Sequence, residues 1–220
     1  MSASQVPTRE AGPLPVGLRN TAIACLVLVG GVGLLSASEA ASLTNLAAVR
    51  EAPARGTSFF ADPALVEKAQ TAQLAAYVSA VEPMQTSRGL VLGALAIACS
   101  LAFVSALRLL RPGGLPRESM RGVLGGAALA AAMLRAIDGA QAAVVARKVG
   151  LAAARVLLDA EPYRSDPATY RALPDWVAAF ITGISVAQTA VVAGGLLVLS
   201  LYFRSEKVRQ IVAFRDGQAG

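Results

Sequence analysis

Four long apolar stretches, separated by segments that hold nearly all of the charged residues, dominate the pattern along this chain. Each stretch approaches the roughly 20 residues that a helix needs to cross a hydrocarbon core about 30 Å thick. Lipid offers the backbone no hydrogen-bonding partner, so a spanning segment must satisfy its own polar groups as a helix. The pattern therefore predicts an all-α polytopic membrane protein with spans at residues 21–38, 89–107, 122–145 and 176–203.

The connecting segments predict a four-helix transmembrane bundle with a small helical extracytoplasmic cap. Asp62 and Pro63 favour a helix start, which gives an outer helix at about 62–82 that Pro83 ends. Apolar residues recur at helical spacing beyond the third span, so we expect it to continue outward to about 161, where Pro162 follows. The remaining segments are a tail at 1–20, an extracytoplasmic loop segment at 39–88, a cytoplasmic turn at 108–121, an outer loop at 162–175 and a tail at 204–220.

The charged residues predict which way the chain crosses the membrane. The two tails and the turn at 108–121 hold ten lysines and arginines against four acidic residues, which accounts for the whole net charge of +6. The outer segments hold nine charges of each sign. Cytoplasmic loops of membrane proteins carry the excess of Lys and Arg, so we expect both termini in the cytoplasm. The Ala, Arg and Gly bias suggests a bacterium, which makes the membrane its inner, cytoplasmic one.

Composition supports membrane residence, because 55% of the residues are hydrophobic, 15% are charged and the mean hydropathy is +0.56. One alternative stays open at the start of the chain. Ser38-Glu39-Ala40 places small residues at the two positions that a signal peptidase reads, so residues 1–40 are either the first span with its tail or a cleaved signal peptide. The other three spans are the same in both cases.

One polar cluster interrupts the third span. Arg135, Asp138 and Gln141 follow an apolar run of only thirteen residues, too short to cross a bilayer, so these side chains must lie within or at its outer part. A rise of about 1.5 Å per residue puts Arg135 roughly 20 Å from the inner boundary. Arg135 and Asp138 are three apart on one helical face and can neutralise each other. Ionisable groups within a membrane commonly mark a ligand site or pathway.

The fourth span offers polar partners to this cluster. Thr182, Ser185, Gln188 and Thr189 form a stripe at helical spacing, and the same rise of about 1.5 Å per residue brings Thr182 level with Arg135. Such a site could bind an anionic headgroup or a small polar solute. The simpler interpretation is a structural latch whose arginine reaches toward the interface.

Small residues four apart indicate close helix contact in a membrane, where backbones can approach at such positions. Gly89 and Gly93 begin the second span, and Gly122 and Gly126 begin the third. The motif does not distinguish a neighbour in the same chain from another subunit. A final pattern, from Arg204 to Phe214, predicts either a short helix that rests on the anionic inner leaflet or docks on a cytoplasmic partner, or a solvated continuation of the fourth span.

The sequence lacks the residues and motifs that several kinds of catalytic, metal and cofactor site require. The chain has no histidine, and its two cysteines, Cys25 and Cys99, lie within predicted spans, where a thiol behaves as a small apolar group. There is no phosphate-binding loop, dinucleotide fingerprint or nucleophile elbow. The basic residues are dispersed near the membrane ends rather than gathered for nucleic acid. We therefore expect no catalytic residue, no metal, no cofactor and no nucleic-acid partner.

The expected function is that of a non-catalytic accessory or scaffolding subunit of a membrane assembly, with lipids and a protein partner or further copies of itself as contacts. The alternative is a small oligomeric transporter, or a lipid-binding or solute-binding membrane protein, that uses Arg135, Asp138, Gln141 and Gln188. Four spans are few for a transporter unless it oligomerises.

Overall fold

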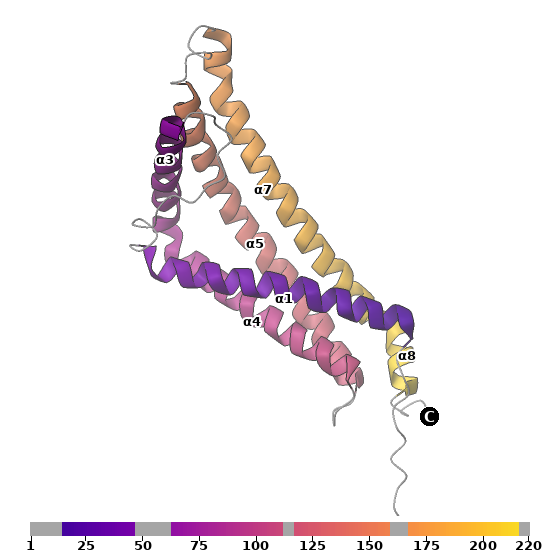
Figure 1. The fold of residues 1–220 in the computed structure, drawn as a ribbon. Coiled ribbons are helices and arrows are strands. Elements are labelled where there is room, and N and C mark those ends of the chain that lie inside the picture. The colour runs from indigo at the N-terminus through magenta and orange to yellow at the C-terminus, as the bar shows by residue number, and fades with distance from the viewer. Residues whose placement is uncertain (1–14, 47–62, 112–116, 159–166, 216–220) are drawn as a thin grey trace, which may run out of the picture. The chain divides into compact units, whose positions relative to one another are not determined.

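The computed structural model describes residues 15–46, 63–111, 117–158 and 167–215. All regular structure in these residues is helical, and four helical segments are long and apolar enough to cross a membrane. The prediction of an all-α chain with four candidate spans is confirmed at this level. The elements in chain order (Figure 1) are α1 (Val16–Thr44), α3 (Pro63–Val81), the 3-10 turn η1 (Glu82–Met84), α4 (Gln85–Leu110), α5 (Arg117–Leu158), α7 (Pro167–Arg204) and α8 (Glu206–Arg215).

The helices extend beyond the spans that the apolar pattern marks. α1 continues to Thr44, and α5 runs for 42 residues without a break. α7 begins at Pro167, so residues 167–175 are helical where the sequence predicts a loop. Proline is pre-organised for the first helical position, whereas Pro174 stands inside the helix and removes one backbone hydrogen bond. The predicted helix start at Asp62 lies outside the described residues.

Contacts between residues divide the chain into two compact units. The first unit comprises Met1–Leu34, Ala96–Ala132 and Gly194–Gly220, and the second comprises Leu35–Leu95 and Met133–Ala193. The first holds ten basic and four acidic residues, a net charge of +6, whereas the second holds ten of each sign. The two units defined by contacts therefore match the two sets of segments that the charged residues distinguish in the sequence, one with a net charge of +6 and one neutral.

In the first unit, helix neighbours lie antiparallel. A Cβ built on Gly33 of α1 would lie 2.9 Å from Cys99 Cβ of α4, and one on Gly30 would lie 3.4 Å from the Phe103 ring. α5 and α7 pair in the same sense, since Ser200 Oγ donates a hydrogen bond of 2.7 Å to the Gly125 carbonyl. α1 also meets α7, because a Cβ on Gly195 would lie 3.5 Å from Leu28 Cδ2.

A buried arginine closes the C-terminal end of α7 in the same unit. Arg121 donates from Nη1 to the Phe203 carbonyl, and from Nε and Nη2 to the Glu118 carboxylate at 2.8 and 2.6 Å. A basic side chain at this place satisfies a carbonyl that has no partner within the helix. Ser205 then breaks the helix, so the C-terminal stretch is the separate helix α8 rather than a continuation of the fourth span. Its Val208 and Val212 are buried.

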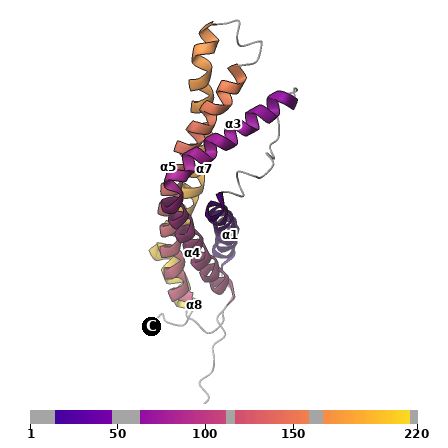
Figure 2. The ribbon, with the colours of Figure 1, turned by 90° about the vertical axis from the view of Figure 1, so that its left-hand side faces the viewer.

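The second unit is built around a small apolar cluster to which four helices contribute. Leu43 of α1, Val81 of α3, Leu92 of α4 and Val145 of α5 are buried together with Ala80. Gln85 Nε2 donates to the Leu43 carbonyl at 2.5 Å and so satisfies one of the last carbonyls of α1. The C-terminal end of α3 is thereby packed onto the apolar helices (Figure 2).

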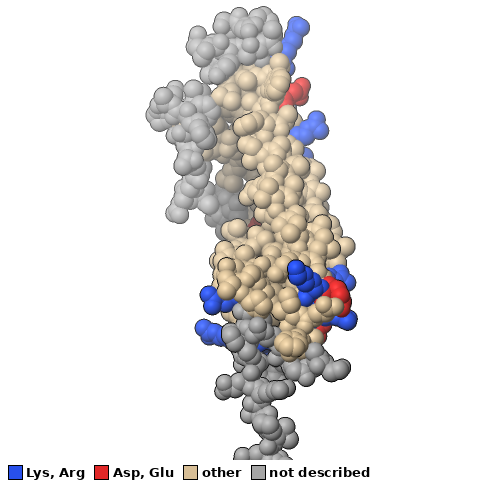
Figure 3. All heavy atoms as spheres, turned by 90° about the vertical axis from the view of Figure 1, so that its right-hand side faces the viewer, with Lys and Arg blue, Asp and Glu red and all other residues tan. Residues whose placement is uncertain are grey.

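Large apolar side chains are exposed along the candidate spans. Within the most apolar window of Tyr170–Arg204, 11% of the residues are buried, and Phe180, Ile184 and Val191 are exposed. No charged residue stands on α7 between Asp175 and Arg204. Figure 3 shows a surface that is largely uncharged, with Lys, Arg, Asp and Glu confined to a few places. An exposed apolar surface of this extent is typical of a membrane or partner contact.

Candidate functional site

The most distinctive group of side chains is a set of four charges in the second unit, here called the charge network: Glu39 of α1, Arg88 of α4, and Arg135 and Asp138 of α5. Arg88 Nη2 lies 2.5 Å from Glu39 Oε1 and 3.5 Å from Asp138 Oδ1. Arg135 Nη1 donates to Asp138 Oδ2. The charges alternate in sign, so the network is neutral and joins three helices.

The charge network is most deeply buried at its centre. The side chain of Asp138 is fully buried, and that of Arg88 is 5% exposed. The outer members are more accessible, at 20% for Arg135 and 32% for Glu39. Removing an isolated charge from water costs several kcal/mol, so the two central groups depend on one another and on their outer partners.

The structure brings together part of the predicted site and adds two residues. Arg135 and Asp138 are paired as their spacing predicts, and Gln141 is on the same helix with its Oε1 buried and without a hydrogen bond. Glu39 and Arg88 were assigned from the sequence to the outer connecting segments. The structure places Glu39 on α1 and Arg88 on α4, where Arg88 is buried against Asp138 and Glu39. Glu39 and Arg88 each lie one residue beyond a predicted span. Their opposite charges, at the same end of two neighbouring spans, are the sequence signal that could have predicted their ion pair.

One polar residue of the fourth span, Thr189, lies beside the charge network, whereas no hydrogen bond or ion pair observed among the described residues joins Thr182, Ser185 or Gln188 to it. Gly139 packs directly on Thr189, and a Cβ on Gly150 would lie 2.8 Å from Ala178 Cα. These two contacts put Arg135 level with Ala193, so the predicted match with Thr182 is wrong by roughly three helical turns. Counting depth from Trp176 caused the error, since α7 begins at Pro167.

The other three predicted polar residues of α7 have different surroundings. Thr182 Oγ1 donates to the Ala178 carbonyl of its own helix at 2.7 Å. Ser185 is half-buried, and Gln188 is exposed. The charge network is therefore completed by α1 and α4, not by α7.

The predicted packing glycines also face elsewhere. A Cβ on Gly89, Gly93, Gly122 or Gly126 would meet no side chain or neighbouring helix of the described residues within 4 Å. The close approaches use other glycines, namely Gly33, Gly125, Gly139 and Gly150. The two predicted glycine pairs therefore make no close helix contact among the described residues. A spacing of four residues identifies one face of a helix but not the neighbour that this face meets.

The site's remaining chemistry is limited. Among the described residues, no three His, Cys, Asp or Glu side chains gather where they could hold a metal ion. Arg88 Nε, Arg135 Nε, Asp138 Oδ1 and Gln141 Oε1 are buried without a hydrogen bond. These atoms offer two donors and two acceptors to a bound water or a small polar group.

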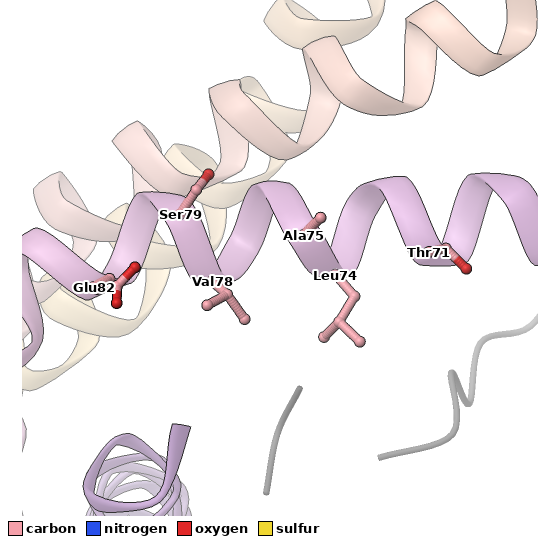
Figure 4. A pocket seen from close by; sticks show the side chains of 6 residues that line it. All are labelled: Thr71, Leu74, Ala75, Val78, Ser79 and Glu82. Atoms are coloured by element: carbon pink, nitrogen blue, oxygen red, sulfur yellow. The ribbon is translucent and has the colours of Figure 1, made fainter. Parts of the chain in front are cut away.

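The surface hollows on α3 lie apart from the charge network. One, with a volume of about 320 Å³, is lined by six residues of the α3–η1 segment, including Leu74, Val78 and Glu82 (Figure 4). Glu67 and Lys68 line a second hollow on the same helix. Neither hollow contains a member of the charge network.

Comparison of the chain with protein-family models, with curated proteins and with solved structures gave no match.

Proposed function

We propose that this chain is a non-catalytic integral membrane protein that serves as an accessory or scaffolding subunit of a membrane assembly. Its four long helices form an antiparallel transmembrane bundle in a bacterial inner membrane, and α3 with the outer part of α5 caps it outside. Contacts between α1 and α4, α4 and α5, α5 and α7, and α7 and α1 support the bundle. The concentration of all net charge in the first unit supports cytoplasmic termini.

The observation that carries this proposal is the self-neutralising charge network. Each buried charge already has an opposite charge of this chain beside it. A transport pathway would instead present its ionisable groups to a water-filled or ligand-filled space. The network therefore acts as a latch that fixes α1, α4 and α5 together, and the exposed apolar helix faces are left for lipid and partner subunits.

A second candidate function, binding of a small polar solute, is favoured by one observation. Arg135 Nε and Gln141 Oε1 are buried on the same helix without hydrogen-bond partners. A ligand with an acceptor and a donor would satisfy both atoms.

Replacing Asp138 with Asn separates the two functions. The change keeps the shape but leaves Arg88 and Arg135 without their shared buried carboxylate. We expect loss of the assembled protein, measured as the disappearance of its monodisperse peak and of co-purifying partners in mild detergent. A D138N protein that stays folded and assembled but loses a solute flux or a bound solute would contradict the accessory role and support the second candidate.

The first span is also proposed to stay attached. α1 continues through Ala40 without a break, and Glu39, within the candidate cleavage motif, is bound to Arg88. We expect a tag placed before Met1 to be retained at full mass, and tags at both ends to resist protease added outside spheroplasts. Recovery of a chain that begins at Ala41 would contradict this topology.

A further inference from the structure

A groove in the second unit is lined by residues of α7 and by Arg147 of α5, with Asp175 at one end, Arg147 near the middle, and Thr182 and small apolar residues along the rest. Its volume is about 640 Å³, and its lining includes Arg147, Asp175, Ala179, Gly183, Val186 and Ala187. It contains no member of the charge network. The groove is therefore a separate site from the latch.

The two charged side chains of the groove are available to a ligand. Arg147 and Asp175 are both exposed, and no ion pair joins either of them to another described residue. The contact of Gly150 with Ala178 sets Arg147 beside residue 181. Asp175 therefore lies about 9 Å further along α7 toward its N-terminal end, at a rise of about 1.5 Å per residue.

The rest of the groove is shaped for an extended apolar chain. Ala179, Gly183 and Ala187 recur every fourth residue, and a Cβ on Gly183 would meet no side chain or neighbouring helix of the described residues within 4 Å. From the level of Arg147, residue 181, to Ala187 the helix rises about 9 Å, which suits the first part of an acyl chain.

We propose that this groove binds one phospholipid with a zwitterionic, primary-amine headgroup, of the phosphatidylethanolamine type, from the outer leaflet. Its phosphate contacts Arg147, its ammonium contacts Asp175, and one acyl chain lies deeper, along Gly183 and Ala187. The inference rests on the proposed membrane residence and orientation. In that orientation the phosphate lies deeper than the amine, which matches the order of Arg147 and Asp175.

The two charges also select among headgroups. An ammonium donates hydrogen bonds to a carboxylate, which a choline headgroup cannot do. A phosphatidylglycerol headgroup brings no cation to Asp175. The groove should therefore prefer the ethanolamine lipid to both.

The experiment is a native mass-spectrometry titration of the full-length protein in mild detergent with ethanolamine, choline and glycerol phospholipids of identical acyl chains. We expect the ethanolamine lipid to bind most tightly. Asp175→Asn should weaken it about fivefold, the upper end for a partly exposed ion pair, and weaken the choline lipid less, because choline has the charge but no N–H donor. Arg147→Gln should weaken both, whereas Lys148→Gln, at an exposed neighbour outside the groove, should weaken neither.

Two matched leucines test the acyl contact. Ala187→Leu fills the groove, whereas Ala190→Leu adds the same side chain at an exposed position outside it. Only the first should reduce lipid binding, and free phosphoethanolamine should not displace the lipid. Equal binding by the two leucine variants, displacement by phosphoethanolamine, or an unchanged headgroup preference in D175N would each overturn the proposal. Carbonate extraction is done first, since a protein lost from membranes there contradicts the proposed function rather than this groove.

Discussion

Replacing Arg88 with methionine is expected to destabilise the folded protein by about 3–5 kcal/mol, the usual cost of leaving a buried charge without its partner. Glu39 would lose the cation 2.5 Å away, and the fully buried Asp138 would keep only Arg135. Methionine retains much of the side-chain length, so the loss reflects charge more than volume. Unfolding in mixed micelles with increasing dodecyl sulfate, followed by circular dichroism, measures the change.

Arg108 on the same helix provides the control. It is exposed at the last turn of α4, so Arg108→Met should change stability by no more than about 0.5 kcal/mol. Adding Glu39→Gln to Arg88→Met should recover part of the loss, because it removes the unpaired carboxylate. Equal stability of R88M and R108M would show that the buried arginine does not hold the helices together.

The second large effect is expected at Gly139 of α5. A methyl group there would overlap the side chain of Thr189 on α7, so Gly139→Ala should destabilise the protein by about 1–3 kcal/mol. Gly126→Ala on the same helix meets open space and should be neutral or stabilising by up to about 1 kcal/mol, the helical preference for alanine. The same dodecyl sulfate titration compares the two variants.

Thr189→Ala tests whether the loss at Gly139 is steric. In the Gly139→Ala background it removes the two closest atoms, Cγ2 and Oγ1, and should restore part of the stability. If G126A were as harmful as G139A, loss of glycine itself rather than helix contact would be the cause.

The residues predicted correctly from sequence are those fixed by local spacing. The length of each apolar stretch identifies a candidate span, and a separation of three residues puts Arg135 and Asp138 on one helical face. Glu39 and Arg88 are 49 residues apart in sequence, and their pairing depends on the antiparallel register of α1 and α4. That register comes from close packing, such as Gly33 on Cys99, which no local pattern encodes.

The alignment of α7 with α5 also could not be predicted from local sequence patterns. A hydropathy boundary near Trp176 was used to align Thr182 with Arg135, but the contact of Gly139 with Thr189 sets the alignment instead. The helix continues to Pro167 because nothing in residues 167–175, Pro174 included, ends it. An apolar boundary therefore locates a span only approximately and does not determine which residues of two spans meet.

A double-mutant cycle on Glu39 and Arg88 tests the latch most directly, because it isolates the coupling between two residues on different helices. Glu39→Gln, Arg88→Met and the double variant are unfolded under identical conditions, and the exposed pair Glu206 and Arg209, with side chains 60% and 58% accessible, is treated in the same way. We expect a coupling energy above about 1 kcal/mol for the buried pair and below about 0.5 kcal/mol for the exposed one. Equal coupling energies for the two pairs would contradict a charge network that holds α1, α4 and α5 together.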